Sequence, residues 1–315
     1  MTRFDLVVVG DANPDLVVTG DVEPAFGQTE RLVDEARLTV GGSGAIMACG
    51  AARLGLRVAM CGVVGDDLYG SWIRDQLRGR GVDVVGLRSS HDLPTGLSVV
   101  LSTDRGDRAI LTHPGTIPTL DVEGVDRGIL EAARHVHVSS YFLQRSLAPD
   151  LPALLEDVHA SGATTSLDPN WDPEEAWDGG LDRVLSRTDV FLPNETEAVR
   201  IARADDLDDA ARTLARSARL VVAKIGPDGA LACEGTTLTR APGIPSTVAD
   251  TTGAGDSFDA GFLASWLAGD PLERALAIGN TCGALSTRAS GGVDGQPTMD
   301  EVAANLAKAP GTVPD

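Results

Sequence analysis

Short apolar runs recur along this chain, and from about residue 120 to residue 225 they alternate with segments of helical period. A run such as Leu6–Val9 is apolar at every position, which is typical of a strand buried on both faces. Similar runs predict strands at Val58–Val64, His135–Ser139, Thr164–Leu167, Val190–Leu192 and Leu220–Ile225. Helices are expected at residues 43–54, Tyr69–Arg80, Leu151–Ala160, Glu195–Ala202 and Asp206–Ser217. This alternation predicts an α/β fold with a doubly wound, mostly parallel sheet.

Two segments of β character, residues 14–40 and 94–116, interrupt the alternation. In the second, Leu97–Ser102 and Arg108–Thr112 flank a turn at 104–107, which predicts a hairpin. We expect the two segments to form a small β lid across the carboxyl ends of the strands, where α/β folds bind ligands. The core then comprises residues 1–13, 41–93 and 117–309, and residues 310–315 are a frayed tail.

The composition of the chain limits which kinds of molecule we expect the protein to bind and where in the cell we expect it. The chain has 315 residues, 43% of them hydrophobic, and a formal net charge of −20, which argues against nucleic acids and anionic membranes as partners. The four cysteines, Cys49, Cys61, Cys233 and Cys282, form no C-x-x-C pair and are expected to be buried in a reducing compartment. Since no apolar run is long enough for a membrane helix, we expect a cytoplasmic protein.

The segment Asp250–Phe258 carries the strongest chemical signal. Gly253, Ala254 and Gly255 form a turn of small residues that runs directly into an amphipathic helix. Backbone N–H groups of such a turn, together with the positive end of the helix, can hold an anion. Asp256 places a carboxylate in the same first turn, where it can accept the proton of an attacking hydroxyl. This combination predicts phosphoryl transfer to a hydroxyl group.

The alternative for this segment is a tight loop in which Asp256 only caps the helix. Other nucleotide motifs are absent from the sequence. There is no G-x-x-x-x-G-K-[ST] loop, no H-R-D loop and no G-x-G-x-x-G after a strand, so a P-loop enzyme, a protein kinase and a dinucleotide oxidoreductase are disfavoured.

The segment resembles the second signature of the ribokinase-like (PfkB) carbohydrate kinases, D-T-x-G-A-G-D-x-F. Gly41–Gly55 is similar to the first signature of that family, a G-G pair that opens an Ala-rich helix ending at L-G. The resemblance continues in the family's order through the segments 62–70, Asp168–Asn170, Asn194–Glu197 and Lys224–Gly229, and so covers nearly the whole chain.

The resemblance implies roles for particular residues. It implies that the acceptor is bound by Asn13, Asp15, Gly41, Gly42 and Ile46, together with Asp256. It implies that the nucleotide is bound by Lys224, Gly226, Gly229, Asn194, Asn280 and Gly283. It implies a magnesium ion linked through water to Glu197, and a monovalent cation, potassium, at Asp250, Thr252 and Gly291. Ordinary turn and helix chemistry explains several of these residues equally well; Asn194, for example, could be a helix cap beside two solvated acids.

Two residues depart from the family pattern. Ile46 stands where the first signature usually carries an Asn that binds sugar hydroxyls, which implies an acceptor with no hydroxyl at that edge unless Ile46 belongs to the core. Asp172 stands where Asp-Pro-Asn-x is often followed by Arg, and would change the local charge near the phosphates.

We therefore expect an ATP-dependent kinase that phosphorylates a hydroxyl of a sugar or sugar acid. Asp256 is the expected base, the amides of Gly253–Asp256 the anion hole, and Mg²⁺ bridges the ATP phosphates. A nucleoside kinase is one alternative, but Phe26 is the only aromatic residue in the two lid segments. A non-catalytic sugar or nucleotide sensor on the same fold is another. The resemblance also leaves a homodimer through the lid open.

Overall fold

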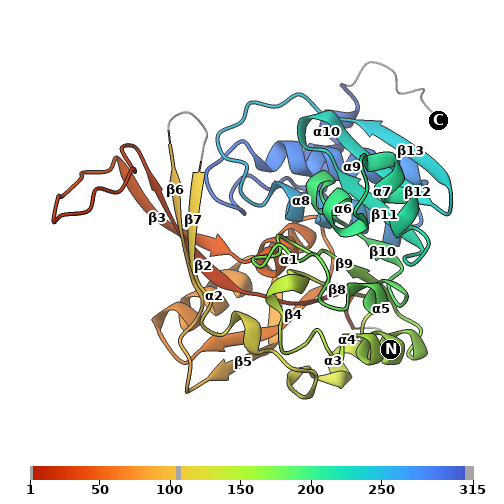
Figure 1. The fold of residues 1–315 in the computed structure, drawn as a ribbon, viewed down its shortest axis with the longest axis horizontal. Helices are drawn as coiled ribbons and strands as arrows, with labels where there is room; N and C mark the ends of the chain where they lie inside the picture. The colour runs from red at the N-terminus through yellow and green to blue at the C-terminus, as the bar shows by residue number, and fades with distance from the viewer. Residues whose placement is uncertain (1–2, 104–107, 309–315) are drawn as a thin grey trace.

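The computed structural model describes residues 3–103 and 108–308, and within them the main sheet has nine strands in the order β13-β12-β11-β10-β9-β8-β1-β4-β5 (Figure 1). Every neighbouring pair is parallel except the two at one edge, β11–β12 and β12–β13. The strands are β1 (Leu6–Val9), β4 (Val58–Gly65), β5 (Val82–Ser90), β8 (His135–Val138), β9 (Thr164–Leu167), β10 (Val190–Phe191), β11 (Leu220–Lys224), β12 (Gly229–Glu234) and β13 (Thr237–Pro242).

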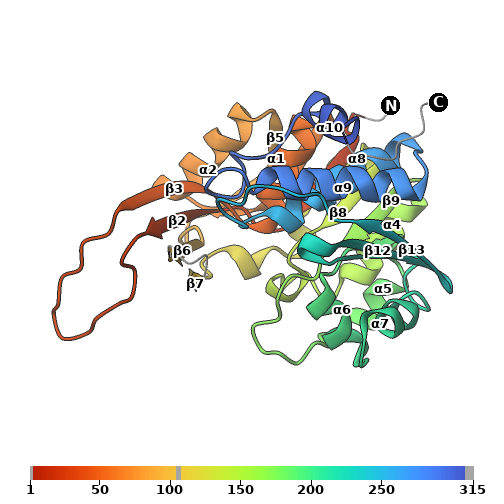
Figure 2. The ribbon, with the colours of Figure 1, turned by 90° about the horizontal axis from the view of Figure 1, so that it is seen from above.

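Helices cover both faces of this sheet, because the central strands are apolar on both sides (Figure 2). One face packs on α1 (Ser43–Arg53), α2 (Leu68–Gly79), α8 (Ala254–Ala268), α9 (Leu272–Ser286) and α10 (Met299–Leu306). The other face packs on α3 (Arg127–Glu131), α4 (Leu151–Ala160), α5 (Leu181–Leu185), α6 (Glu195–Ala202) and α7 (Leu207–Leu214). The two faces form separate hydrophobic clusters, which confirms the doubly wound, mostly parallel sheet.

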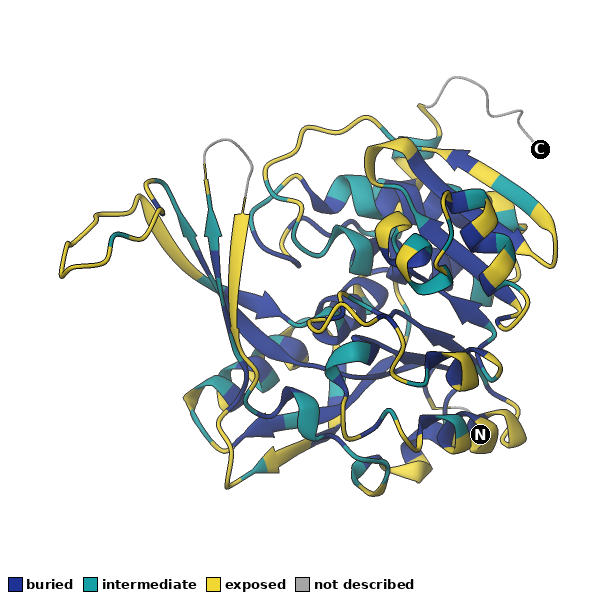
Figure 3. Ribbon diagram, in the orientation of Figure 1, coloured by how far each residue is buried: buried dark blue, intermediate teal, exposed yellow. Residues whose placement is uncertain are grey.

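A second, small sheet of the described residues contains β2 (Asn13–Thr19), β3 (Glu35–Gly41), β6 (Leu97–Ser102) and β7 (Arg108–His113), in the order β3-β2-β6-β7. The pair β2–β6 is parallel and the outer pairs are antiparallel, so β6 and β7 form the predicted hairpin. Its turn, 104–107, lies outside the described residues. The small sheet projects from one side of the main sheet, and its outer strand β7 is exposed along its length (Figures 1 and 3).

The sequence pattern identified most elements within one or two residues. Leu6–Val9, Thr164–Leu167, Leu151–Ala160 and Glu195–Ala202 match the predicted bounds. The hairpin β12–β13, strand β5 and the short helices α3 and α5 were not predicted. The predicted frayed tail at 310–315 lies outside the described residues.

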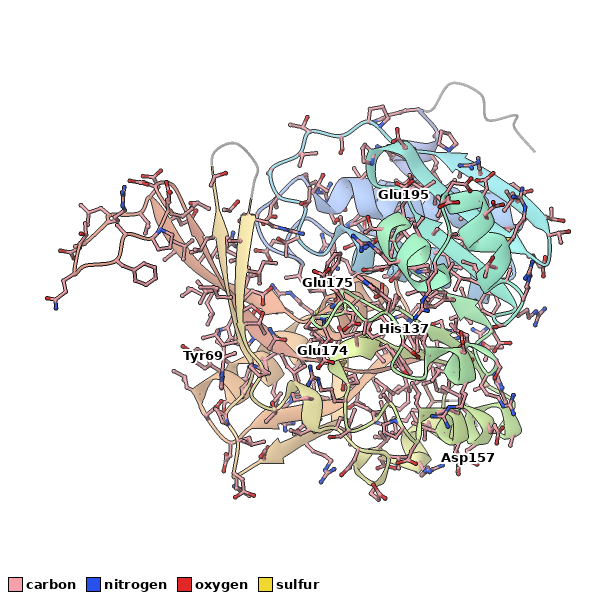
Figure 4. The ribbon with its side chains drawn as sticks, viewed as in Figure 1. Tyr69, His137, Asp157, Glu174, Glu175 and Glu195 are labelled. Atoms are coloured by element: carbon pink, nitrogen blue, oxygen red, sulfur yellow. The ribbon has the colours of Figure 1, made fainter. Side chains whose placement is uncertain are left out.

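The two histidines of β8 are in the core, and Figure 4 labels one of them, His137. His135 and His137 are fully buried, and the Ser166 hydroxyl lies 2.7 Å from a ring nitrogen of each, His135 Nε2 and His137 Nδ1. Burial holds the pKa of His137 down at about 4, so the ring is neutral. Among the described residues no three His, Cys, Asp or Glu side chains form a metal cluster.

The four cysteines are buried, as expected, and their thiols are free. No helix in the described part of the chain is long and apolar enough to cross a membrane.

Candidate active site

A cavity of about 630 Å³ lies where the carboxyl ends of the main-sheet strands face the small sheet. Asp11 follows β1, Asp168 follows β9, Asn194 follows β10 and Lys224 ends β11, so strand order alone brings these side chains together. Of the predicted site residues, the cavity is lined by Asn13, Asp15, Gly42, Ile46, Asn194, Glu197, Lys224, Thr252, Gly253, Ala254, Gly255 and Asp256. It is not lined by Gly41, Gly226, Gly229, Asp250, Asn280, Gly283 or Gly291.

One wall of the cavity is a polar segment, here called the Asp11–Asp15 loop, which runs from the end of β1 into the first residues of β2. Asn13 donates from Nδ2 to Asp15 Oδ1 at 3.1 Å, and Asp11 Oδ1 accepts from Gly44 N at 3.1 Å. Burial raises the pKa of Asp15 to about 7, and the nearby Asp11 charge adds to the rise. Buried carboxyl groups of this kind are suited to accept hydrogen bonds from vicinal hydroxyls of a ligand.

The two glycines at the start of α1 allow this loop to approach the helix. A Cβ on Gly41 would overlap the Asp15 carboxylate, and a Cβ on Gly42 would lie 2.8 Å from Asn13 Oδ1. Gly42 also has a φ of 80°, which only glycine adopts without strain. Gly41 therefore supports the site through Asp15 without lining the cavity.

The floor of the cavity is the start of α8. Gly253 is the N-cap residue with a φ of 71°, and Ser257 is the first residue whose N–H bonds back along the helix, to Gly253 O. Ala254 N bonds to Thr251 O, which leaves the first-turn amides of Gly255 and Asp256 directed out of the helix end. These amides and the helix dipole make the predicted anion cradle a physically sound site for a phosphoryl group.

Asp256 lies in the cradle and lines the cavity. Burial raises its pKa to about 8, the negative charge of Asp168 adds to the rise, and the Lys224 ammonium opposes it. A carboxyl group with a pKa near neutrality is matched to accepting and returning a proton.

Beneath the cradle, Lys224 bridges two carboxyl groups. Its Nζ lies 2.6 Å from Asp168 Oδ2 and 3.0 Å from Asp259 Oδ2, and the side chains are 11%, 9% and 1% exposed. Burial alone would lower the pKa of Lys224, but the charges of Asp168 and Asp259 outweigh it and the pKa is raised. The pKa of Asp259 is raised by burial while that of Asp168 is lowered, against burial, mainly by Lys224. Lys224 and Asp168 therefore form a buried charged pair, and Asp259 is a second partner of the ammonium.

This cluster ties three elements to one point, because Lys224 comes from β11, Asp168 from the end of β9 and Asp259 from the second turn of α8. The Lys224 side chain also runs under Gly255, where an added Cβ would lie 3.7 Å from Nζ. The lysine that the sequence assigned to the nucleotide therefore has its ammonium group on protein carboxylates, directly below the cradle.

We expect Gly253→Ala to lower the free energy of unfolding by about 1–3 kcal/mol and to reduce kcat, because alanine is strained at positive φ. Its Cβ would also lie 2.8 Å from Ile46 Cγ2 and 2.9 Å from Gly292 Cα. The matched control is Gly255→Ala, since Gly255 has helical φ and its Cβ would make an ordinary contact with Lys224. Denaturant unfolding of both variants checks this, and equal losses of stability would contradict it.

Ile46 lies under the cradle at the edge of the cavity. It is 3% exposed, and its branched side chain packs against Gly253 and Gly292. Its carbonyl accepts from Gln296 Nε2 at 2.9 Å. Ile46 therefore contacts both the cavity and the backbone that holds the anion cradle. The interpretation that it faces the acceptor and the alternative that it belongs to the core each describe part of its surroundings.

Asn194 and Glu197 form a capping box at the start of α6. Asn194 Oδ1 accepts from Glu197 N at 2.9 Å, and Glu197 Oε2 accepts from Asn194 N at 2.8 Å. Burial raises the pKa of Glu197 to about 7, with the Asp168 charge contributing. Both residues also line the cavity, so the cap presents a carboxyl group to it.

The remaining residues assigned to the nucleotide lie away from the cavity lining. Gly226 and Gly229 form the turn between β11 and β12 with φ of 57° and 103°. Asn280 Nδ2 donates to Ala241 O at 3.2 Å and Pro242 O at 3.0 Å, which holds β13 against α9. A Cβ on Gly283 would lie 3.1 Å from Ala254 O, so this glycine allows α9 to approach the start of α8.

The proposed monovalent-cation residues connect two loops beside the cradle. Asp250 Oδ1 accepts from Thr252 N at 2.9 Å and from Thr252 Oγ1 at 2.8 Å, while Asp250 Oδ2 accepts from Gly291 N at 2.8 Å. Asp250 therefore fixes the turn before Gly253 to the loop 290–292. A carboxylate and a hydroxyl lie together here, and both supply the oxygen atoms that a monovalent cation binds.

Sequence reasoning did not single out several residues that line the cavity, among them Ser43, Arg108, Asn170 and Trp171. Arg108 comes from β7, and its Nη1 donates to Thr252 Oγ1 at 3.1 Å, so the small sheet contacts the cradle loop. A signal for Asn170 existed, because it belongs to the Asp-Pro-Asn segment. Nothing in the local sequence marks Arg108 or Trp171.

Asp172, the second departure from the family pattern, does not line the cavity. Its carboxylate accepts from Glu174 N at 3.0 Å and Trp177 N at 2.7 Å, within its own loop. Its charge is thus held by local backbone amides.

Comparison with known proteins gives a consistent result. Residues 3–299 match the pfkB family of carbohydrate kinases. An ATP-dependent ribose-1-phosphate kinase of Halopiger xanaduensis is 33% identical, over 95% of this chain and 97% of that protein. A 2-dehydro-3-deoxygluconokinase of Bacillus subtilis is 30% identical, over 82% of this chain and 84% of that protein. The structure of Arabidopsis thaliana ribokinase complexed with ribose and ATP has a TM-score of 0.82 at 25% identity, covering 97% of this chain and 99% of that chain. The chain belongs to the pfkB family of carbohydrate kinases.

Proposed function

We propose that this kinase transfers the γ-phosphoryl group of ATP to a hydroxyl of a sugar or sugar acid in one in-line step. Asp256 accepts the proton as the hydroxyl oxygen attacks phosphorus, the bond to ADP breaks, and the amides of Gly253–Asp256 hold the charge that develops on the phosphoryl oxygens. The observation that carries this proposal is the carboxyl group of Asp256 beside the unpaired amides of α8, in a cavity walled by the Asp11–Asp15 loop.

Magnesium bound to ATP phosphates would neutralise charge in this mechanism. The residues present fit an ion held mainly by phosphates and water, because Mg²⁺ commonly takes only one or two protein carboxylates. Glu197, which lines the cavity beside Asn194, would hold it through water. For the nucleotide itself, Lys224 and the turn of Gly226 and Gly229 remain the proposed neighbours.

The direct test measures ADP release with a panel of sugars, sugar acids, sugar phosphates and nucleosides. We expect turnover with a sugar or sugar acid, and preference for a nucleoside would replace this proposal with the nucleoside-kinase alternative. Binding of ATP and a sugar with no ADP release from any acceptor would instead support the non-catalytic sensor.

We expect potassium to raise kcat, because an ion held near Asp250 and Thr252 would fix the amides of the adjoining cradle. Turnover and melting temperature are compared in potassium and in tetramethylammonium at equal ionic strength. Binding to the folded state also raises the melting temperature. Equal rates and equal melting temperatures in the two salts would remove the cation from the mechanism.

The small sheet remains the predicted lid of the active site. A homodimer that forms through this sheet is also still a prediction.

A further inference from the structure

The loop that follows β9, residues 170–177, is held in an unusual backbone conformation. Asn170, Glu175 and Trp177 have φ values of 55°, 51° and 55°, although none is glycine. Non-glycine residues at positive φ are strained, and such strain persists where the surroundings impose it, often beside a functional site. Glu174 and Glu175 mark this loop in Figure 4.

The loop places an indole ring in the active-site cavity. Trp171 lines the cavity and is 44% exposed. Trp177 supports it from behind, with ring centroids 4.9 Å apart and planes at 87°, and Trp177 in turn packs edge-on against Phe142 at 5.8 Å. Because Trp177 is buried, Trp171 rests on a fixed base and leaves much of its own surface uncovered inside a cavity.

Hydrogen bonds connect this tryptophan to the acceptor side of the cavity. Trp171 N donates to Asn170 Oδ1 at 2.8 Å, and Asn170 Nδ2 donates to Ser140 Oγ at 3.1 Å. Ser140 Oγ donates to Asp11 Oδ1 at 2.9 Å, and Asp11 belongs to the polar loop that also carries Asn13 and Asp15. The position of Trp171 is thus coupled to the carboxylates proposed to hold the acceptor hydroxyls.

Further apolar side chains line the same cavity. Val100 and Ile110 come from the small sheet, and Ile117 and Leu143 come from the segments that follow it. A cavity lined by both carboxyl groups and apolar side chains suits a ligand with a hydroxyl edge and an apolar face. A sugar in its ring form has both, because its C–H bonds gather on one face of the ring.

We infer that Trp171 is the stacking platform of the acceptor site, so that the acceptor binds in its ring form with its C–H face against the indole. This inference rests on the proposed function and narrows the acceptor to a cyclic sugar or cyclic sugar acid. The backbone conformation of Asn170 orients Trp171. The Asp11–Asp15 loop holds the edge of the acceptor that carries its hydroxyl groups.

Fluorescence titration without ATP tests the platform separately from phosphoryl transfer. The probes are D-fructose and D-ribose, each compared with its ring-locked methyl glycoside and its open-chain alditol. We expect a change in tryptophan fluorescence with the free sugar and the glycoside, and a much weaker change with the alditol. The change should vanish in Trp171→Leu and persist in the control Trp72→Phe, because Trp72 packs from α2 against the core and does not line the cavity.

Steady-state kinetics with the accepted sugar give the second readout. Trp171→Leu, which keeps an apolar side chain against Trp177, should raise the acceptor KM about tenfold with little change in ATP KM, and Trp171→Phe should recover most of the loss. A purely structural role would lower the melting temperature and change both KM values together.

The inference fails if neither sugar nor glycoside alters Trp171 fluorescence, if the alditol binds as well as the ring, or if adenosine alone binds with a stacking signal. If no acceptor supports ADP release but a cyclic sugar still gives the Trp171 signal, the proposed phosphoryl transfer fails and the platform stands.

Discussion

Replacing Asp256 with asparagine is expected to lower kcat by about two to four decades while leaving the affinity for ATP nearly unchanged. The amide keeps the shape of the side chain but cannot accept the proton of the acceptor hydroxyl. Because burial raises the pKa of Asp256 to about 8, kcat/KM of the wild-type enzyme should rise with pH and level off above that value. The asparagine variant should lack this rise. Near-wild-type turnover in the variant would remove Asp256 as the base.

Stability measurements provide the control for this variant. Because the pKa of this carboxyl group is raised on folding from 3.8 to about 8, its stabilising contribution is fully present below about pH 4 and is lost progressively as the pH rises from about 4 to about 8. Asp256→Asn does not ionise, so at pH 9 it should be at least as stable as wild type, with the difference shrinking towards pH 4. An inactive but less stable variant at pH 9 would indicate misfolding rather than a lost base.

The second large effect is expected from Lys224→Met. Removing the ammonium leaves Asp168 as a buried charge without its cation, which costs about 3–5 kcal/mol in unfolding free energy. We also expect kcat to fall about ten- to hundredfold, since α8 is no longer tied to β9 and β11 below the cradle. Denaturant unfolding and steady-state kinetics measure the two effects.

Lys308→Met is the matched control, because Lys308 is the other lysine of the chain and is exposed near the end of the described residues. The loss of stability in Lys224→Met should be smaller at pH 5 than at pH 8, since Asp168 can then take up a proton. Adding Asp168→Asn should restore stability but not activity, because both buried charges are then gone while the link to α8 stays broken. A Lys224→Met variant as stable as wild type would contradict the buried-pair interpretation.

The sequence alone determined the fold class and the run of residues that forms the start of α8. Leu6–Val9 is short and apolar at every position, as a strand buried on both faces requires, so local pattern was sufficient. The Gly253–Asp256 turn was readable for a similar reason, since its backbone amides, carboxylate and helix start are neighbours in the chain. Strand β5 and the hairpin β12–β13 lie at the edges of the sheet, where the pattern is less uniform.

Tertiary structure decided the contacts between residues distant in sequence. Lys224, Asp168 and Asp259 come from three elements, and their pairing depends on strand order and on the docking of α8, which no local pattern encodes. The same holds for Arg108 beside Thr252 and for Trp171 in the cavity, whose exposed ring is surrounded by other parts of the chain. The same distinction between sequence and tertiary structure applies to the ionisation of Asp256. The sequence identified this residue, but the burial of its carboxyl group beside Asp168 and Lys224 sets its pKa. Local chemistry is specified by neighbours along the chain, whereas burial and electrostatics depend on neighbours in space.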